Sequence, residues 1–127
     1  MNQVVTVLIP CNSIVYLEEC LESISLQTYP NFEVLIILNG QAILDHDHVV
    51  FMGTKLGIKL RVLISEAQNI SDALNEGLVK CDNELIARMD ADDLMLPDRL
   101  ESQVNAMSNQ SIVAVGTQIV RLYSNKN

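Results

Sequence analysis

The residues of this sequence best suited to chemistry by type and spacing are Asp90-Ala91-Asp92-Asp93. In an extended chain the side chains of residues i and i+2 point to the same side, so Asp90 and Asp92 would project together, about 7 Å apart along the backbone. Two carboxylates at that spacing repel each other unless solvent or a cation separates them. Hard oxygen ligands of this kind suit Mg²⁺ or Mn²⁺, which commonly bridge to the phosphates of a substrate.

The same four residues are also typical of a solvated loop in which Asp92 or Asp93 caps the following helix. Their location separates the two interpretations. They follow residues 84–89, an apolar run that we expect to form a buried strand. Because open α/β sheets bind ligands beyond the carboxyl ends of their strands, this location favours a metal or diphosphate site.

Apolar runs and amphipathic segments alternate along the chain. We expect strands at residues 4–9, 33–38, 59–64, 84–89 and 112–122, the last with a bulge at Gly116. We expect helices at residues 16–26 and 43–52, a third capped by Ser71 that buries Leu74, Gly77, Leu78 and Cys81, and a fourth beginning at Pro97. This order predicts one α/β domain over residues 1–127, with a mainly parallel sheet and helices on both faces.

The charge balance excludes one large class of partners. Eight Lys and Arg residues stand against sixteen Asp and Glu residues, which gives a formal net charge of −8. A basic stripe that neutralises phosphates is incompatible with this balance, so we expect no nucleic-acid partner. A bound anion would need a metal ion or a few local donors to offset the charge.

The three cysteines, Cys11, Cys20 and Cys81, are odd in number and widely spaced. They match neither a zinc pattern nor a disulfide framework, so a reducing cytoplasm is expected. The sequence does not open with a basic region followed by a long apolar stretch, so we expect no signal peptide. The longest apolar run has five residues (34–38), far fewer than the ~18 of a transmembrane segment, so none is expected.

The acidic run belongs to a longer pattern. Residues 84–93 (ELIARMDADD) and 96–100 (LPDRL) resemble family 2 glycosyltransferases of the GT-A fold, in the branch that builds bacterial capsule, exopolysaccharide and lipopolysaccharide. Residues 5–10, 16–24 and 27–30 (QTYP) look like the opening strand and helix of that family, and residues 71–78 (SDALNEGL) look like its middle helix. These segments follow one another in family order and cover most of the chain.

The resemblance implies a Rossmann-like portion that binds a nucleotide diphosphate sugar. The complete enzyme would transfer the sugar, with inversion, to a saccharide or lipid-linked saccharide acceptor, in the cytoplasm or peripherally at the inner face of the membrane. The resemblance implies Mg²⁺ or Mn²⁺ as cofactor, Asp92 as its direct ligand and Asp90 on the metal or the ribose. The residues expected at the donor are Pro10, Cys11, Asn12, Asn39, Gly40, Asn69, Ala73, Arg88, Asp90, Ala91 and Asp92.

Three positions depart from the family pattern. Residues 9–13 lack the usual Tyr, so an aromatic face near the base is expected to be missing. Leu38 and Asn39 stand where the family carries Asp residues that contact the base. Asn39 either contacts the base in altered form or, with Gly40, only makes a tight turn. Asn69 stands where the family often has Gly.

Some polar and reactive residues have two interpretations. Arg88 either pairs with Asp90 or a phosphate, or extends from an edge strand into solvent. His46 and His48 suggest a metal, but alternate residues of a helix do not face one way, which favours an exposed polar segment. Cys11 has no His partner nearby in sequence, so a packed thiol is favoured over a nucleophile.

Length points to an incomplete catalytic unit. Family members are about twice as long, and their second half supplies the acceptor contacts and the general base. We therefore expect residues 1–127 to form the donor-binding portion, with the acceptor-binding half absent, the base unidentified and little turnover. An unpaired fifth strand would leave an apolar edge, through which we expect self-association.

Two other classes compete with this interpretation. The chain is alternatively a short relative that kept the fold and lost catalysis, and acts as a nucleotide-binding or scaffold protein. A phosphoacceptor receiver domain shares the length and element order, but it needs acidic residues after the first strand, Asp after the third and Lys after the fifth. Residues 10–12, 65–66 and 123–124 do not supply them.

Overall fold

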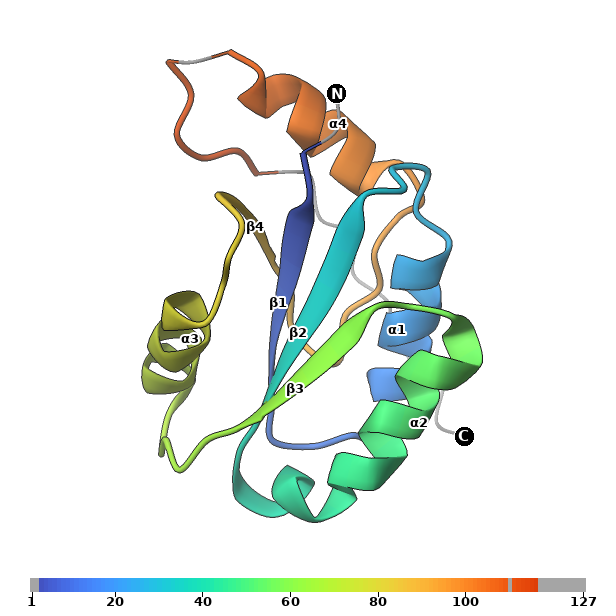
Figure 1. The fold of residues 1–127 in the computed structure, drawn as a ribbon, viewed down its shortest axis with the longest axis vertical. Helices are drawn as coiled ribbons and strands as arrows, with labels where there is room; N and C mark the ends of the chain where they lie inside the picture. Colours follow the sequence, from blue (N-terminus) through green and yellow to red (C-terminus); the bar gives the residue numbers. More distant parts are fainter. Residues whose placement is uncertain (1–2, 110, 117–127) are drawn as a thin grey trace, which may run out of the picture.

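The computed structural model describes residues 3–109 and 111–116. Four strands alternate with helices in the order β1 (Val5–Cys11), α1 (Leu17–Ser25), β2 (Phe32–Leu38), η1 (Gly40–Asp45), α2 (His46–Leu56), β3 (Leu60–Ile64), α3 (Ile70–Val79), β4 (Leu85–Arg88) and α4 (Arg99–Met107). Figure 1 shows the strands as one twisted sheet between two layers of helices. The expected βα order is confirmed.

The sheet is parallel throughout and has the order β3-β2-β1-β4. The central strand β1 pairs with β2 along its whole length, but with β4 only from Val5 to Leu8. Every residue of β1 is buried, and β2 is buried from its second residue onward. These continuous apolar runs are typical of strands covered on both faces, which is the predicted architecture.

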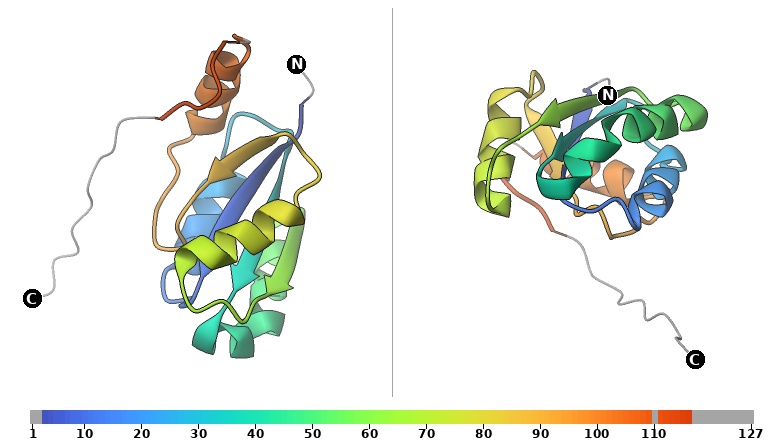
Figure 2. Two further views of the ribbon diagram at one scale, coloured as in Figure 1. Left: turned by 90° about the vertical axis from the view of Figure 1, so that its left-hand side faces the viewer. Right: turned by 90° about the horizontal axis from the view of Figure 1, so that it is seen from below.

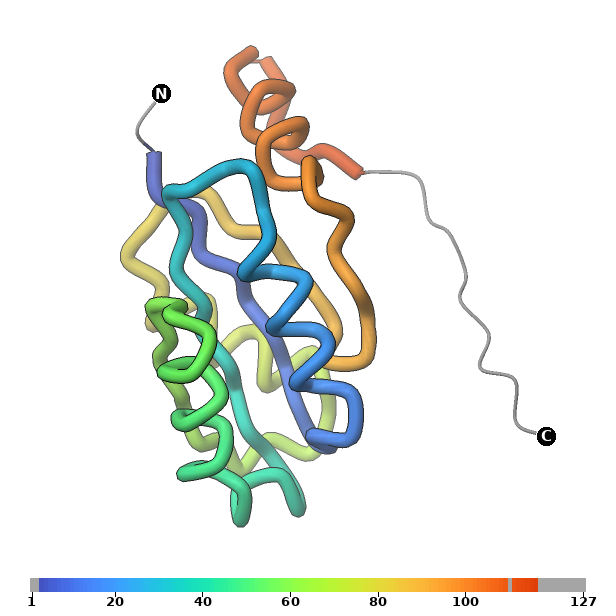
Figure 3. Tube along the Cα trace, turned by 90° about the vertical axis from the view of Figure 1, so that its right-hand side faces the viewer, coloured from blue at the N-terminus to red at the C-terminus, as the bar shows by residue number. Residues whose placement is uncertain are grey.

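The two faces of the sheet carry different helices. Helices α1, α2 and α4 share one core with β1 and β2, whereas α3 packs on the opposite face. Figure 3 shows α1 and α2 side by side on their face, with α4 beyond the amino ends of β1 and β2. In the described residues, no helix has the length and apolar character needed to cross a bilayer.

Helix α3 lies very close to the sheet because a glycine faces it. An added Cβ at Gly77 would overlap Ile37 Cδ1 and lie 2.8 Å from Leu8 Cδ1. Ala73, one turn earlier, is fully buried at the same contact. The predicted buried face was wrong in part, because Leu78 is 46% exposed and Ala73 takes its place.

Helix starts were the least accurate predictions. The residue that caps α3 is Asn69, whose side-chain oxygen accepts a hydrogen bond from Asp72 N at 2.8 Å, so the predicted Ser71 cap is wrong. Pro97 lies in the turn before α4, which begins two residues later at Arg99. The predicted helix at residues 43–52 is divided, since the 3₁₀ turn η1 precedes α2.

The predicted fifth strand is wrong where the structure describes it. Residues 112–116, including Gly116, form no strand, and the rest of the prediction, residues 117–122, lies outside the described residues. Self-association through that edge therefore has no support from residues 112–116 and stays a prediction.

Candidate functional site

The strand order reverses beside β1, and this places a site at the carboxyl edge of the sheet. From β1 the chain adds β2 and β3 on one side and then returns to place β4 on the other. Ligands of open α/β sheets bind at such switch points. Figure 2 (right) views the molecule from below, the side of this edge. A cavity of about 410 Å³ lies there, lined by Pro10, Cys11, Asn12, Ser13, Val15, Tyr16, Asn39, Ile70, Asp90, Ala91 and Asp92.

Pro10 helps to open this edge. Leu8 O accepts a hydrogen bond from Met89 N at 3.1 Å, so the main-chain groups of Leu8 face β4. Main-chain groups two residues apart in a strand face the same neighbouring strand, so those of Pro10 also face β4. Proline has no N–H to donate to that strand. Pairing with β4 ends at Leu8, and the acidic segment leaves the sheet there. On the other side, Cys11 O accepts from Asn39 N at 3.1 Å, so β1 and β2 stay paired.

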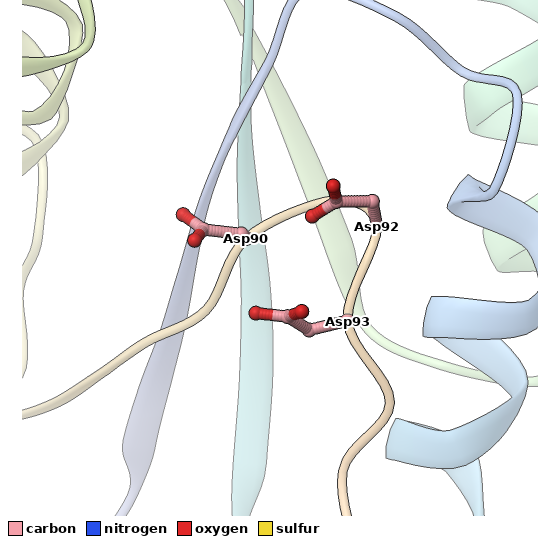
Figure 4. Close-up of side chains that lie close together, drawn as sticks. All are labelled: Asp90, Asp92 and Asp93. Atoms are coloured by element: carbon pink, nitrogen blue, oxygen red, sulfur yellow. The ribbon is translucent and has the colours of Figure 1, made fainter. Parts of the chain in front are cut away.

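The acidic run forms a turn rather than the extended segment assumed from sequence. Asp93 N donates to Asp90 O at 3.2 Å and closes the turn at Ala91 and Asp92. Figure 4 shows all three carboxyl groups pointing the same way from the loop. One carboxylate oxygen from each of Asp90, Asp92 and Asp93 lies within 4.8 Å of the other two. The predicted pair is therefore a trio, although Asp93 itself does not line the cavity.

The charges of this trio oppose one another. Burial and the neighbouring Asp92 and Asp90 charges raise the pKa of the Asp93 carboxyl, and Arg99 partly offsets them. Arg88 Nη2 lies 3.6 Å from Asp90 Oδ1, and its side chain is more than half exposed on the edge strand β4, so the structure contains features of both interpretations of Arg88. Neither Asp92 nor Asp93 caps the next helix, since Asp98 holds that position.

The cluster fits a divalent cation. It presents hard carboxylate oxygens, as Mg²⁺ and Mn²⁺ prefer, and it leaves positions open toward the cavity. A cation would also relieve the repulsion that raises the pKa of Asp93.

An aromatic side chain does line the cavity, contrary to the expectation from the first turn. Tyr16, just before α1, is 53% exposed and contributes to the wall with Val15. Residues 9–13 themselves contain no aromatic side chain, and a contact between Tyr16 and a base stays a prediction. The segment after β1 continues to Tyr16, and that continuation was the signal available in the sequence.

At the end of β2, the turn interpretation of Asn39 is confirmed, and its contact with a base stays a prediction. Asn39 precedes η1, and Gly40 has the positive φ of 59° that favours glycine, so the pair does make a turn. Asn39 also lines the cavity, and its Nδ2 donates to Ala67 O at 3.3 Å. Leu38 is fully buried.

Four of the predicted donor residues do not line the cavity: Gly40, Asn69, Ala73 and Arg88. Asn69 caps α3, Arg88 pairs with Asp90, and Ala73 is buried in the core. Ala73 is fully buried against the sheet, and its donor contact stays a prediction. Ile70, next to Asn69, lines it instead.

Cys11 and Cys20 are packed thiols rather than nucleophiles. Burial raises the pKa of the Cys11 thiol to about 11 and that of Cys20 to about 12. The Sγ of Cys20 donates to Asp90 O at 3.7 Å and so touches the acidic loop from below. All three cysteines are free.

His46 and His48 lie at the start of α2, outside the residues that line the cavity. His46 Nδ1 contacts Asp47 Oδ1 at 3.1 Å on an exposed surface. Within residues 3–109 and 111–116, the cluster that could hold a metal is Asp90, Asp92 and Asp93.

Known proteins resemble this chain in sequence and in fold. The family model described as glycosyl transferase family 2 matches residues 6–127. An uncharacterized glycosyltransferase of Haemophilus influenzae is 38% identical over 115 residues, 88% of this chain and 42% of its own length. The O-antigen biosynthesis glycosyltransferase WbnJ of Escherichia coli is 38% identical over 104 residues, 82% of this chain and 41% of its own length.

Among solved structures, the mannosyltransferase PcManGT from Pyrobaculum calidifontis, in complex with GDP-Man and Mn²⁺, superposes with a TM-score of 0.77. It is 24% identical, and the match covers 85% of this chain and 33% of that one, which shows the shared GT-A fold. The chain spans about two fifths of the length of the curated relatives named above. From its match to the family model and its likeness to these relatives, the chain belongs to glycosyl transferase family 2.

Proposed function

We propose that this chain is the donor-binding portion of a metal-dependent glycosyltransferase. The complete enzyme would transfer a sugar, with inversion, from a nucleotide diphosphate sugar to a saccharide or lipid-linked acceptor during synthesis of cell-surface polysaccharide. The observation that carries the proposal is the cavity at the switch point, which has Asp90 and Asp92 on its wall and Asp93 beside them. The O-antigen enzyme among the relatives supports the polysaccharide assignment.

In this proposal Asp92 and Asp90 hold Mg²⁺ or Mn²⁺, with Asp93 as a third oxygen donor nearby. A bound divalent cation is a Lewis acid that stabilises the negative charge of a departing diphosphate. The protein carries a formal net charge of −8, so an anionic donor needs such a counter-charge. By holding the cation, the carboxylates would allow this acidic surface to bind an anion.

Two other residues that line the cavity suit a nucleoside. The half-exposed Tyr16 ring offers an apolar face on which a base can stack. Asn39 offers its side-chain amide at the end of β2, where it is held by Ala67 O. Both side chains border the same cavity as the acidic loop, so a nucleoside diphosphate would contact them and the cluster together.

The described part of the site contains no separate general base. Its lining residues with titratable side chains are Cys11, Tyr16, Asp90 and Asp92. The two carboxylates are assigned to the metal, and the raised pKa of Cys11 keeps its thiol protonated at neutral pH. The acceptor hydroxyl must then lose its proton to a group outside these residues, so the 127-residue chain should bind donor but turn over little.

A cytoplasmic location, peripheral at the inner face of the membrane, belongs to the same proposal. Its support is that Cys11, Cys20 and Cys81 are all free, which suits a reducing compartment.

Titration calorimetry with UDP and GDP, with and without Mn²⁺, tests the proposal. We expect one of the nucleotides to bind, and to bind far more tightly when Mn²⁺ is present. Asp92→Asn should remove the Mn²⁺-dependent part of the affinity. Asp82→Asn, at an exposed position near the amino end of β4, makes the same charge change away from the cavity and should leave it intact. Absence of any nucleotide binding by the folded protein contradicts the donor site.

A second candidate is a nucleotide-binding or scaffold protein of the same fold that has lost catalysis. One observation favours it, since the fully buried Leu38 replaces a carboxylate that family members use at the base. The same titration separates the two: a folded chain that binds nucleotide equally with and without Mn²⁺ favours this candidate.

A further inference from the structure

The acidic loop is joined to α4 by a segment without helix or strand. Residues 94–98 run between Asp93 and the start of α4. Met95 is buried, and so is Leu100 in the first turn of the helix. Main-chain groups need hydrogen-bond partners, and the main chain supplies one here, since Leu96 O accepts from Arg99 N at 3.1 Å.

Gln27 provides further partners from outside the segment. Its Nε2 donates to Leu96 O at 2.7 Å and, more weakly, to Met95 O at 3.5 Å. Its Oε1 accepts from Leu100 N at 3.1 Å. One buried amide, two residues beyond α1, therefore holds both ends of the connecting segment.

Neighbouring residues complete the attachment. Ser23 Oγ accepts a hydrogen bond from Met95 N at 2.9 Å. Thr28 N donates to Pro97 O at 2.8 Å. The end of α1 and the residues after it thus fix the segment at Met95, Leu96 and Pro97, and the first turn of α4 at Leu100.

The other end of the acidic loop is fixed by β4, where Met89 N bonds to Leu8 O. Between these attachments lie the three mutually repelling carboxylates, and only Leu94, which is exposed, separates Asp93 from Met95. Repulsion would move the carboxylates apart if the far end of the loop were free. A fixed segment opposes that movement.

From this arrangement we infer that Gln27 is a positioning residue for the acidic cluster. By fixing Met95 and Leu96 it holds Asp92 and Asp93 near Asp90. The inference rests on the proposed function as far as metal binding is concerned. Residues that orient metal ligands from outside the coordination shell typically contribute about 10-fold or more to metal affinity.

The test uses Gln27→Met, which nearly preserves side-chain volume and removes the hydrogen bonds. Its matched control is Asn83→Ala. Asn83 Nδ2 donates to Thr6 Oγ1 and Glu33 Oε1, each at 3.0 Å, at the amino edge of the sheet. Each variant loses the hydrogen bonds of a side-chain amide, which is buried at Gln27 and partly buried at Asn83. Only Gln27→Met loses hydrogen bonds to the segment that follows the acidic loop.

Hydrogen exchange by mass spectrometry on the 127-residue chain is the first readout. We expect Gln27→Met to raise the exchange rate of residues 90–97 by about tenfold, and Asn83→Ala to leave it unchanged. If Gln27→Met does not fold, Ser23→Ala replaces it. This change removes the acceptor of Met95 N, together with the hydrogen bond that Ser23 Oγ donates to Cys20 O within α1. Unchanged exchange in residues 90–97 overturns the inference.

Mn²⁺ affinity, measured by electron paramagnetic resonance of the free ion, is the second readout. We expect Gln27→Met to weaken Mn²⁺ binding by about 10-fold and Asn83→Ala to keep the wild-type affinity. A wild-type chain that binds no Mn²⁺ overturns the proposed metal site, and with it this half of the inference. If the wild-type chain binds Mn²⁺ and Gln27→Met binds it with the same affinity, the positioning role of Gln27 is overturned and the proposed metal site is not.

Discussion

Replacing Gly77 by Ala tests how closely α3 lies on the sheet, and two effects of opposite sign compete there. Glycine in a helix interior is about 1 kcal/mol less favourable than Ala, so helix propensity alone predicts that Gly77→Ala stabilises the protein. The added Cβ, however, would overlap Ile37 Cδ1 and lie 2.8 Å from Leu8 Cδ1. Both contacts are to the ends of strand side chains with almost no exposed surface, so any movement away from the new methyl group must take place within the core.

The size of the loss follows from these contacts. Adding a methyl group to a well-packed core costs about 1–3 kcal/mol, and overlap with two fixed side chains points to the upper half of that range. Subtracting the gain of about 1 kcal/mol in propensity leaves a net loss of about 1–2 kcal/mol in the free energy of unfolding.

Urea denaturation followed by far-ultraviolet circular dichroism measures this loss, and the absence of Trp makes that probe preferable to fluorescence. Asn75→Ala is the matched control, because Asn75 is exposed on the same helix. It should gain up to about 0.6 kcal/mol from propensity. If Gly77→Ala stabilises the protein as Asn75→Ala does, α3 is not packed on the sheet as described.

Three more predictions concern the site. With a thiol reagent at pH 8, Cys81 should react first, and Cys11 and Cys20 only on unfolding, because burial raises their pKa to about 11 and about 12. Tyr16→Ala should weaken nucleotide binding several-fold in calorimetry while the melting temperature hardly changes, because the ring is half-exposed. In metal-free buffer, Asp93→Asn should stabilise the protein at neutral pH but not at low pH. The folded pKa of Asp93 is raised, so its carboxylate destabilises the wild type as pH rises above the usual Asp value of about 3.9; equal unfolding curves for both proteins at neutral pH would contradict this.

Elements with strong local patterns were predictable from the sequence. Strands β1 and β2 are apolar apart from Thr6 and Glu33, and the positions of the helices between strands follow from the spacing of apolar residues and the lengths of the segments. Helix α3 shows the limit. Ser71 and Asn69 are both good caps by residue type, and only the geometry of the chain decides that Asn69 Oδ1 reaches Asp72 N.

The candidate site was predictable in its acidic residues but not in their arrangement. Periodicity in an extended chain paired Asp90 with Asp92, whereas the turn closed by Asp93 N brings in a third carboxylate. Gln27 carries no sequence signal of its role, because its partners are main-chain groups near residue 96, far away in sequence. Such long-range hydrogen bonds depend on how helices pack, which local patterns do not encode.

The central claim is that the carboxyl edge of the sheet binds a divalent cation together with a nucleoside diphosphate. Nuclear magnetic resonance of the ¹⁵N-labelled chain, with UDP or GDP and substoichiometric Mn²⁺, tests it residue by residue, since the paramagnetic ion broadens nearby amide signals. We expect broadening at residues 90–93, 11–16 and 39, and none at residues 82–85 on the opposite edge. Broadening confined to the start of α2, around His46 and His48, or none at all in the folded protein, would contradict the account.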